Sequence, residues 1–175
     1  GMGTHVIFGD SATASWTDGV IDGFETLSPE VGDADTITAG DGDAIVVGGA
    51  AGDSVTVGQG THVLAGDSVS ATYVNGVLAT LASLETGVGG NDTITATDGD
   101  HWIVGGFGAD GIATGMGAHV IFGDSGSASW TDGVIDGFET LSPGVGDADT
   151  ITAGDGDAIV VGGAAGDSVT VGQGT

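Results

Sequence analysis

Runs of three strand-forming residues recur along the chain at nine-residue intervals, separated by six residues rich in Gly and Asp. The middle residue of each run is aliphatic, as in Ile94, Ile103 and Ile112. Because alternate residues of a strand point to opposite faces, each run sends one aliphatic side chain to one face. Two consecutive nonapeptides therefore predict an 18-residue coil with two short strands. Stacked coils predict two parallel sheets around a narrow aliphatic core.

The residues that flank the aliphatic position differ between the two predicted sheets. In one sheet they are mostly Thr and Ser, which predicts a polar outer face. In the other sheet they are largely apolar. A sheet that is apolar on both faces is normally covered, and an uncovered apolar patch would be an interaction site. The predicted interaction face comprises Phe8, Val47, Trp102, Val104 and Phe122.

A 21-residue segment after every fourth nonapeptide is the predicted cover for this apolar face. Each copy contains Asp-Gly or Asn-Gly between strand-like residues, which is the strongest short signal for a β-hairpin. A two-residue turn at Asp132-Gly133 would set Trp130 opposite Ile135, and the other two copies would pair in the same way. Two alternatives for the 21-residue segment are that it forms an irregular third coil, or that it reaches a neighbouring chain.

The segments form a repeat of 57 residues, made of four nonapeptides and one 21-residue segment. Residues 1–61 recur as 115–175 with four differences, and a looser copy lies between them. The sequence begins and ends inside a nonapeptide, so we expect a window on a longer tandem array. The expected divisions of one continuous solenoid are 1–29 (the end of a nonapeptide and a hairpin), the units 30–86 and 87–143, and the partial unit 144–175.

The charge of the chain is one-sided. It has no Lys, no Arg and no Cys, against 25 Asp and Glu residues, and its formal net charge is −25. Such self-repulsion strains a compact chain unless cations bind to it, while the 39% of hydrophobic residues argues against disorder. Nucleic acid is excluded as a partner by the charge, and no apolar run is long enough to span a membrane. Metal cations are therefore the expected counter-charges.

The nonapeptide GGFGADGIA at 105–113 matches the pattern GGxGxDxUx, where U is a large aliphatic residue, at every fixed position. The chain resembles the RTX (repeats-in-toxin) family of calcium-binding nonapeptide repeats over about two-thirds of its length. The resemblance implies a parallel β-roll in which Ca²⁺ lies between turns, held by turn carbonyls and the Asp at the sixth position. The expected fold is all-β: a parallel β-roll or β-solenoid of 18-residue coils with a β-hairpin insertion in each 57-residue unit.

The sixth position distinguishes the two edges of this predicted roll. On one edge it is always Asp, and these residues are the expected calcium ligands: Asp35, Asp53, Asp92, Asp110, Asp149 and Asp167. On the other edge it is Ala or His, and alternate nonapeptides carry Asp at their third and fifth positions instead. These residues could bind calcium in another geometry or simply face solvent: Asp41, Asp43, Asp98, Asp100, Asp155 and Asp157.

Two further polar positions recur in each unit. A zinc site at the repeated histidines would need ligands from neighbouring repeats, so the expected role is a turn histidine that donates to a backbone carbonyl. These histidines are His5, His62 and His119. A turn role is also expected for the Asp of the Gly-Asp-Ser that opens each 21-residue segment, and the alternatives are that it caps that edge or acts as a ligand. These residues are Asp10, Asp67 and Asp124.

These features favour a structural role. We expect a calcium-binding segment of a long secreted bacterial protein, acting as a stalk, fibre or filament building block outside the cell, with export by the type I route that the resemblance implies. The expected partners are calcium and either neighbouring repeats or other copies. We expect no catalysis, because every Ser/His/Asp grouping recurs in each unit. The alternatives are an adhesive module that uses the hairpins or the apolar face, and an ice-binding Thr ladder, interrupted by Gly111 and Ala113.

Overall fold

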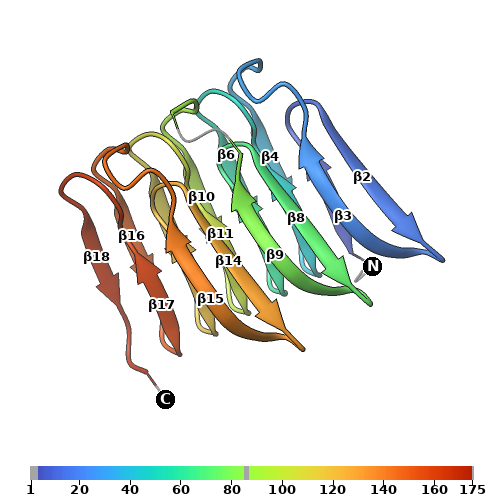
Figure 1. Cartoon of the computed structure of the whole chain (residues 1–175). Helices are drawn as coiled ribbons and strands as arrows, with labels where there is room; N and C mark the ends of the chain where they lie inside the picture. The colour runs from blue at the N-terminus through green and yellow to red at the C-terminus, as the bar shows by residue number, and fades with distance from the viewer. Residues whose placement is uncertain (1–3, 85–86, 175) are drawn as a thin grey trace.

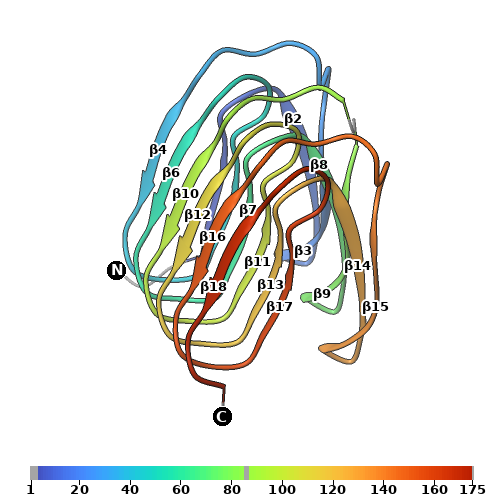
Figure 2. The same cartoon turned by 90° about the vertical axis from the view of Figure 1, so that its left-hand side faces the viewer.

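A computed structural model describes residues 4–84 and 87–174 of the chain. Within these residues the protein consists of eighteen β-strands in three six-stranded sheets. Two sheets are parallel, the third is antiparallel, and they lie in three layers (Figure 1 and Figure 2). The predicted all-β class with parallel sheets is therefore confirmed. The boundary expected between units 30–86 and 87–143 adjoins residues 85–86, which lie outside the described residues.

The nonapeptide strands alternate between the two parallel sheets along the chain. The Thr-rich sheet has the order β4 (Thr36–Ala39), β6 (Ser54–Val57), β10 (Thr93–Ala96), β12 (Gly111–Thr114), β16 (Thr150–Ala153) and β18 (Ser168–Val171). The middle sheet has the order β1 (His5–Phe8), β5 (Ala44–Val47), β7 (His62–Ala65), β11 (His101–Val104), β13 (His119–Phe122) and β17 (Ala158–Val161). Neighbouring strands pair in register, so that equivalent nonapeptide positions lie side by side.

An aliphatic core fills the space between these two sheets, as the nine-residue pattern predicted. Ile94 and Ile112 from the Thr-rich sheet meet Ile103 and Ile121 from the middle sheet, and all four are buried. Branched aliphatic residues suit this place because they pack well on a pleated surface. Thr side chains next to them, such as Thr36 and Thr150, are exposed on the outer face.

The 21-residue segments form β-hairpins, and the three hairpins pair with one another in a single antiparallel sheet. This hairpin sheet has the order β2 (Ala12–Thr17), β3 (Val20–Thr26), β8 (Val69–Val74), β9 (Val77–Ser83), β14 (Gly126–Thr131) and β15 (Val134–Thr140). The predicted pairs are confirmed: Trp16 with Ile21, Tyr73 with Leu78, and Trp130 with Ile135. Both turn residues have positive φ, for example 52° at Asp132 and 78° at Gly133, which is the geometry that an Asp-Gly turn favours.

The hairpin sheet covers the apolar outer face of the middle sheet. A second core lies between them and includes Phe24, Leu81 and Trp130 from the hairpins. The five residues predicted as an interaction face belong to this core: Val47, Val104 and Phe122 are buried, while Phe8 and Trp102 are partly buried against it. The prediction that the hairpins cover this face is therefore confirmed, and the five residues contact the apolar sides of the hairpins.

Candidate functional site

The six sixth-position Asp residues form one line beside the first residues of the strands of the Thr-rich sheet, here named the Asp row: Asp35, Asp53, Asp92, Asp110, Asp149 and Asp167. Each carboxylate from Asp53 onward receives a hydrogen bond on Oδ1 from the backbone N–H of the preceding member. The N···O distances along the row are 2.7, 2.6, 2.8, 2.8 and 3.0 Å. The Asp side chains therefore connect successive layers. These hydrogen bonds agree with the prediction that the six residues share one edge.

The second oxygen of each central carboxylate has no such bond. Among the described residues, the Oδ2 atoms of Asp53, Asp92, Asp110 and Asp149 are buried without a hydrogen-bond partner. A buried carboxylate without compensation is unfavourable, and the chain contains no Lys or Arg that could pair with it. The row therefore presents a line of oxygen atoms that lack a counter-charge within the protein.

Backbone carbonyls lie next to these unpaired oxygens. A Cβ atom added to Gly66 would lie 2.7 Å from the carbonyl oxygen of Gly105 and closer still to Oδ2 of Asp92. A Cβ atom on Gly123 would similarly meet the carbonyl oxygen of Gly162, at 2.5 Å, and Oδ2 of Asp149. Glycine is required at these corners because a carboxylate and a carbonyl approach the same point. Such sets of hard oxygens are the ligands that Ca²⁺ prefers.

Substituting Gly105 should test how tightly this corner is packed. A Cβ atom there would overlap the carbonyl oxygen of Gly123 and Oδ2 of Asp110, whereas a Cβ atom at Gly40 would have no neighbour within 4 Å. We expect Gly105→Ala to lower the free energy of unfolding by about 3 kcal/mol, as overpacking does, and Gly40→Ala to change it by less than about 1 kcal/mol. Urea unfolding at fixed calcium measures both. Equal effects of the two substitutions would contradict this packing.

The Asp residues that open the hairpin segments also belong to this edge. Oδ2 of Asp67 accepts a hydrogen bond from the backbone N–H of Phe107, and its Oδ1 accepts one from Gly90 at 3.2 Å. Asp124 accepts the N–H of Ala164, and Asp10 accepts that of Ala50 at 2.7 Å. These carboxylates therefore hold turns that lie 23 to 40 residues further along the chain, and the expected role within their own turn is not what these bonds show. Their position close to the Asp row was not predicted. The Gly-Asp-Ser that recurs in every unit indicated only that this Asp has the same role each time.

Burial at this edge favours the protonated form of the carboxyl groups. Neighbouring carboxylates add to the effect of burial, and the backbone N–H groups that donate to the carboxylates oppose it. The pKa rises from 3.8 to about 6 for Asp53, about 7 for Asp110 and Asp149, about 8 for Asp92 and about 9 for Asp67. Near neutral pH the edge therefore needs either bound protons or bound cations.

The Asp residues of the other edge lie at solvent-facing turns. Asp41, Asp43, Asp100, Asp155 and Asp157 are exposed, and Asp98 is partly buried. Their Oδ1 atoms accept backbone N–H groups of the next layer, with distances of 2.8 Å for Asp100 and Asp155, 2.9 Å for Asp43 and Asp98, and 3.0 Å for Asp41. Each of these five carboxylates thus has a structural use that requires no metal.

The histidines of the middle sheet form a buried stack. The rings of His62, His101 and His119 lie parallel, with centroids 4.9 and 5.0 Å apart. Nε2 of each ring lies 2.8–3.0 Å from the carbonyl oxygen four residues earlier. Burial lowers the pKa of His101 to about 4, so its ring is neutral and Nε2 donates to that carbonyl. The backbone contact expected of a turn histidine is therefore present at His62 and His119, while the equivalent carbonyl for His5 belongs to residue 1, outside the described residues.

No group of three or more His, Asp, Glu or Cys side chains in residues 4–84 and 87–174 is arranged to hold a metal ion. The Asp row instead supplies one carboxylate per layer, with glycine carbonyls beside it. A metal ion at this edge would therefore take many of its ligands from the backbone.

The described part of the chain contains no helix long and apolar enough to cross a membrane. Comparison with known proteins gave no matching family model, no matching curated protein and no matching solved structure.

Proposed function

We propose that the chain is a calcium-binding structural segment of an extracellular bacterial protein, and that it acts as a calcium-stiffened stalk, fibre or filament building block. In this proposal the two parallel sheets are the walls of a β-solenoid of the RTX β-roll type. The observation that carries it is the line of buried Oδ2 atoms at Asp53, Asp92, Asp110 and Asp149, which have no partner among the described residues of a chain without Lys or Arg.

The residues that would hold calcium are the Asp row and the glycine carbonyls at its corners. The Asp side chains would contribute charge, while the carbonyls of residues such as Gly105 and Gly162 would complete a shell of hard oxygens. Bound calcium would neutralise the carboxylates of adjacent layers. The nonapeptide match at 105–113 supports this choice of cation, because its Gly and Asp positions are those of the RTX pattern.

Calcium would also control folding. Ligands that come from successive layers are not arranged in the unfolded chain, so the free energy of metal binding becomes free energy of folding. Where calcium is scarce, as in the cytosol, the Asp row would have no counter-charge, so the folded state would be less stable and the chain better suited to type I export. Outside the cell, calcium would stiffen the layers. No step of this role requires catalysis, and we propose that the chain is not an enzyme.

The adhesive alternative receives less support from the structure than the structural role. Of the two surfaces that it could use, the apolar face of the middle sheet is covered by the hairpins, as the burial of Val47, Val104 and Phe122 shows, which leaves the hairpins themselves. The exposed Thr residues of the Thr-rich sheet leave ice binding as a separate hypothesis that thermal hysteresis would test.

Far-UV circular dichroism during a calcium titration from EDTA to millimolar calcium tests the proposal at pH 9, where the chain in EDTA is expected to be unfolded, with magnesium as the control. We expect a cooperative gain of β signal with calcium and not with magnesium. Asp92→Asn with Asp110→Asn should raise the calcium midpoint at least about tenfold, because Asn keeps the Oδ1 acceptor but removes the charge. A β spectrum in EDTA that calcium leaves unchanged would overturn the calcium role.

The matched control for this titration is Asp18→Asn with Asp132→Asn. It removes the same charge at two exposed hairpin turns, and the middle hairpin already has Asn75 at this position. The control should keep the calcium midpoint of the unaltered chain. An equal shift in both double variants would show that net charge matters and the Asp row does not.

A further inference from the structure

The Asp residues that open the second and third hairpins are buried beside the Asp row. Asp67 is 3% exposed and Asp124 is 2% exposed. Each directly follows a corner glycine. A Cβ atom added to the first of these glycines, Gly66, would lie against Oδ2 of Asp92, and the same contact recurs 57 residues later. Burial and, after it, the charge of Asp92 raise the pKa of Asp67. Two buried carboxylates therefore lie close together in each of these layers, in a chain without Lys or Arg.

Glycine residues of two later turns leave room for each hairpin Asp. A Cβ atom on Gly89 or Gly106 would collide with the carboxylate of Asp67. Gly106 also has a φ of 120°, which residues with a side chain rarely adopt. In the layer of Gly106 the chain reads Gly-Gly at 105–106, whereas in the adjacent layer it reads Gly-Asp at 66–67. The carboxylate is therefore an addition to the Gly-Gly turn, and the surrounding turns accommodate it.

Several oxygen atoms around these carboxylates have no hydrogen-bond partner in the described part of the chain. They are Oδ2 of Asp92 and of Asp149, Oδ1 of Asp124, and Oγ of Ser68, the residue after Asp67. All four side chains are buried. Leaving buried oxygens unpaired is costly, and oxygens of this kind are the ligands that Ca²⁺ prefers. The layers of the two hairpin Asp residues therefore hold more unpaired oxygen than the Asp row alone provides.

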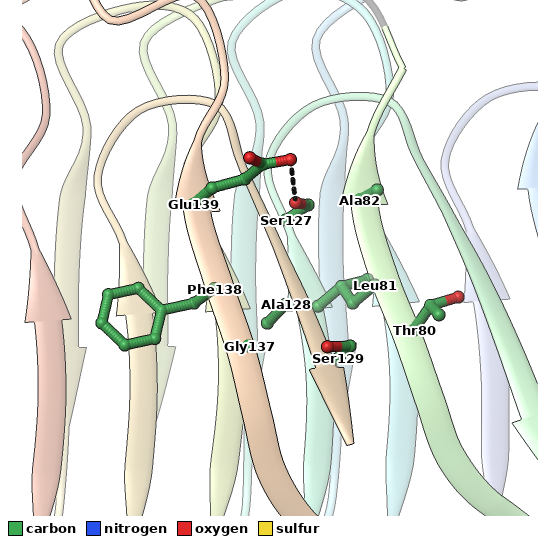
Figure 3. Close-up of a pocket in the computed structure, with 9 residues that line it drawn as sticks. All are labelled: Thr80, Leu81, Ala82, Ser127, Ala128, Ser129, Gly137, Phe138 and Glu139. Carbon is green, nitrogen blue, oxygen red and sulfur yellow. Dashed lines mark hydrogen bonds between the residues drawn. The ribbon is translucent and has the colours of Figure 1, made fainter. Parts of the chain in front are cut away.

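The hairpin sheet fixes where the two hairpin Asp residues lie. β14 pairs with β9, and Figure 3 shows Ala128 beside Leu81 at this contact. Oγ of Ser83, at the end of β9, accepts the backbone N–H of Gly126, two residues after Asp124, at 3.2 Å. An equivalent bond runs from the first residue of β8 to the hydroxyl at the end of β3. The hairpin carboxylates in turn accept N–H groups from turns of the following unit, so they connect the hairpin sheet to the edge that carries the Asp row.

We propose that Asp67 and Asp124 are additional calcium ligands, which act together with Asp92 and Asp149, so that the same ions hold the hairpin sheet to the parallel sheets. The inference rests on the calcium role proposed above and extends it to carboxylates outside the nonapeptides. Calcium affinity depends on the number of charged ligands. The two hairpin layers should therefore bind calcium more tightly than the layer of Asp110, where glycine takes the place of the second Asp.

Equilibrium dialysis with calcium at pH 7 tests this assignment in the full chain. We expect Asp67→Asn with Asp124→Asn to weaken two calcium sites at least about tenfold, because each loses one of two charged ligands. Tryptophan fluorescence, to which Trp102 and Trp130 beneath the hairpin sheet contribute, should shift to a correspondingly higher calcium midpoint. Asp124→Asn alone can keep the acceptor for the N–H of Ala164 and should weaken one site. This milder variant decides the question if the double variant does not fold.

The matched control is Asp43→Asn with Asp100→Asn, on the edge away from the Asp row. It removes the same charge, and both carboxylates also accept a backbone N–H of the next layer, at 2.9 and 2.8 Å. The control should keep each calcium affinity within about twofold, since exposed charges are screened by salt. Equal weakening by the two double variants would overturn the assignment. Unchanged affinities in the Asp67 and Asp124 variants of a chain that binds calcium would overturn this inference alone, whereas an unaltered chain that binds no calcium would overturn both proposals.

Discussion

In EDTA, the chain is expected to lose stability as the pH rises from about 5 to about 9, and to unfold at the upper end of this range. The pKa values of Asp53, Asp110, Asp149, Asp92 and Asp67 are raised from 3.8 to between about 6 and about 9. The folded chain thus retains protons that the unfolded chain has already released, so stability falls with pH across this window. The loss should be on the order of 5 kcal/mol, enough to unfold a domain of ordinary stability.

Calcium should remove this pH dependence, because it binds the ionised carboxylates and competes with protons. Melting temperatures followed by circular dichroism at pH 5, 7 and 9, with EDTA or with millimolar calcium, measure both effects. The melting temperature in EDTA should fall at each step, while that in calcium should stay constant or rise. A metal-free chain that is as stable at pH 9 as at pH 5 would show that the Asp row remains ionised without cost.

Trp130→Ala should destabilise the chain by about 4 kcal/mol, which is the cost of removing a buried aromatic side chain. Trp130 is packed in the core beneath the hairpin sheet, and its ring contacts Trp102 edge to face with centroids 6.0 Å apart. It also pairs across the hairpin with Ile135. Its loss would leave a cavity between the hairpin sheet and the middle sheet.

Trp16→Ala is the matched control, because Trp16 occupies the same repeat position at the exposed edge of the hairpin sheet. Its substitution should cost less than about 1 kcal/mol, as most changes at exposed sites do. Urea unfolding of both variants at saturating calcium and low protein concentration gives the comparison. If both substitutions lower the free energy of unfolding by less than about 1 kcal/mol, the hairpin sheet adds little to the stability of the middle sheet.

The parts of this structure that follow from local sequence were predictable. The nine-residue pattern gave the aliphatic core, with Ile94 and Ile112 facing Ile103 and Ile121. The Asp-Gly and Asn-Gly turns gave the hairpins with their pairs, because two residues of positive φ leave one register for the flanking strands. These features depend only on residues close together in the sequence, and the same pattern recurs in each repeat unit.

The parts that depend on distant segments were harder to predict. Each of the first two hairpins pairs with the next hairpin, as β3 does with β8 and β9 with β14, and no local signal indicates a partner so far along the chain. The same return of the chain buries Asp67 and Asp124 beside the Asp row. In the sequence alone, their Gly-Asp-Ser setting indicates a turn, and the environment that raises their pKa values is created only by packing.

Every repeat unit lengthens all three sheets by the same number of strands, which limits how the number of repeats can change by gene duplication. Each unit of 57 residues adds two strands to every sheet, so duplication of a whole unit preserves all pairings. Duplication of a single 18-residue pair of nonapeptides would lengthen the parallel sheets but leave a gap between adjacent hairpins. Recombination is thereby restricted to whole units, and the length of the array changes in increments of about 10 Å, the width of two strands.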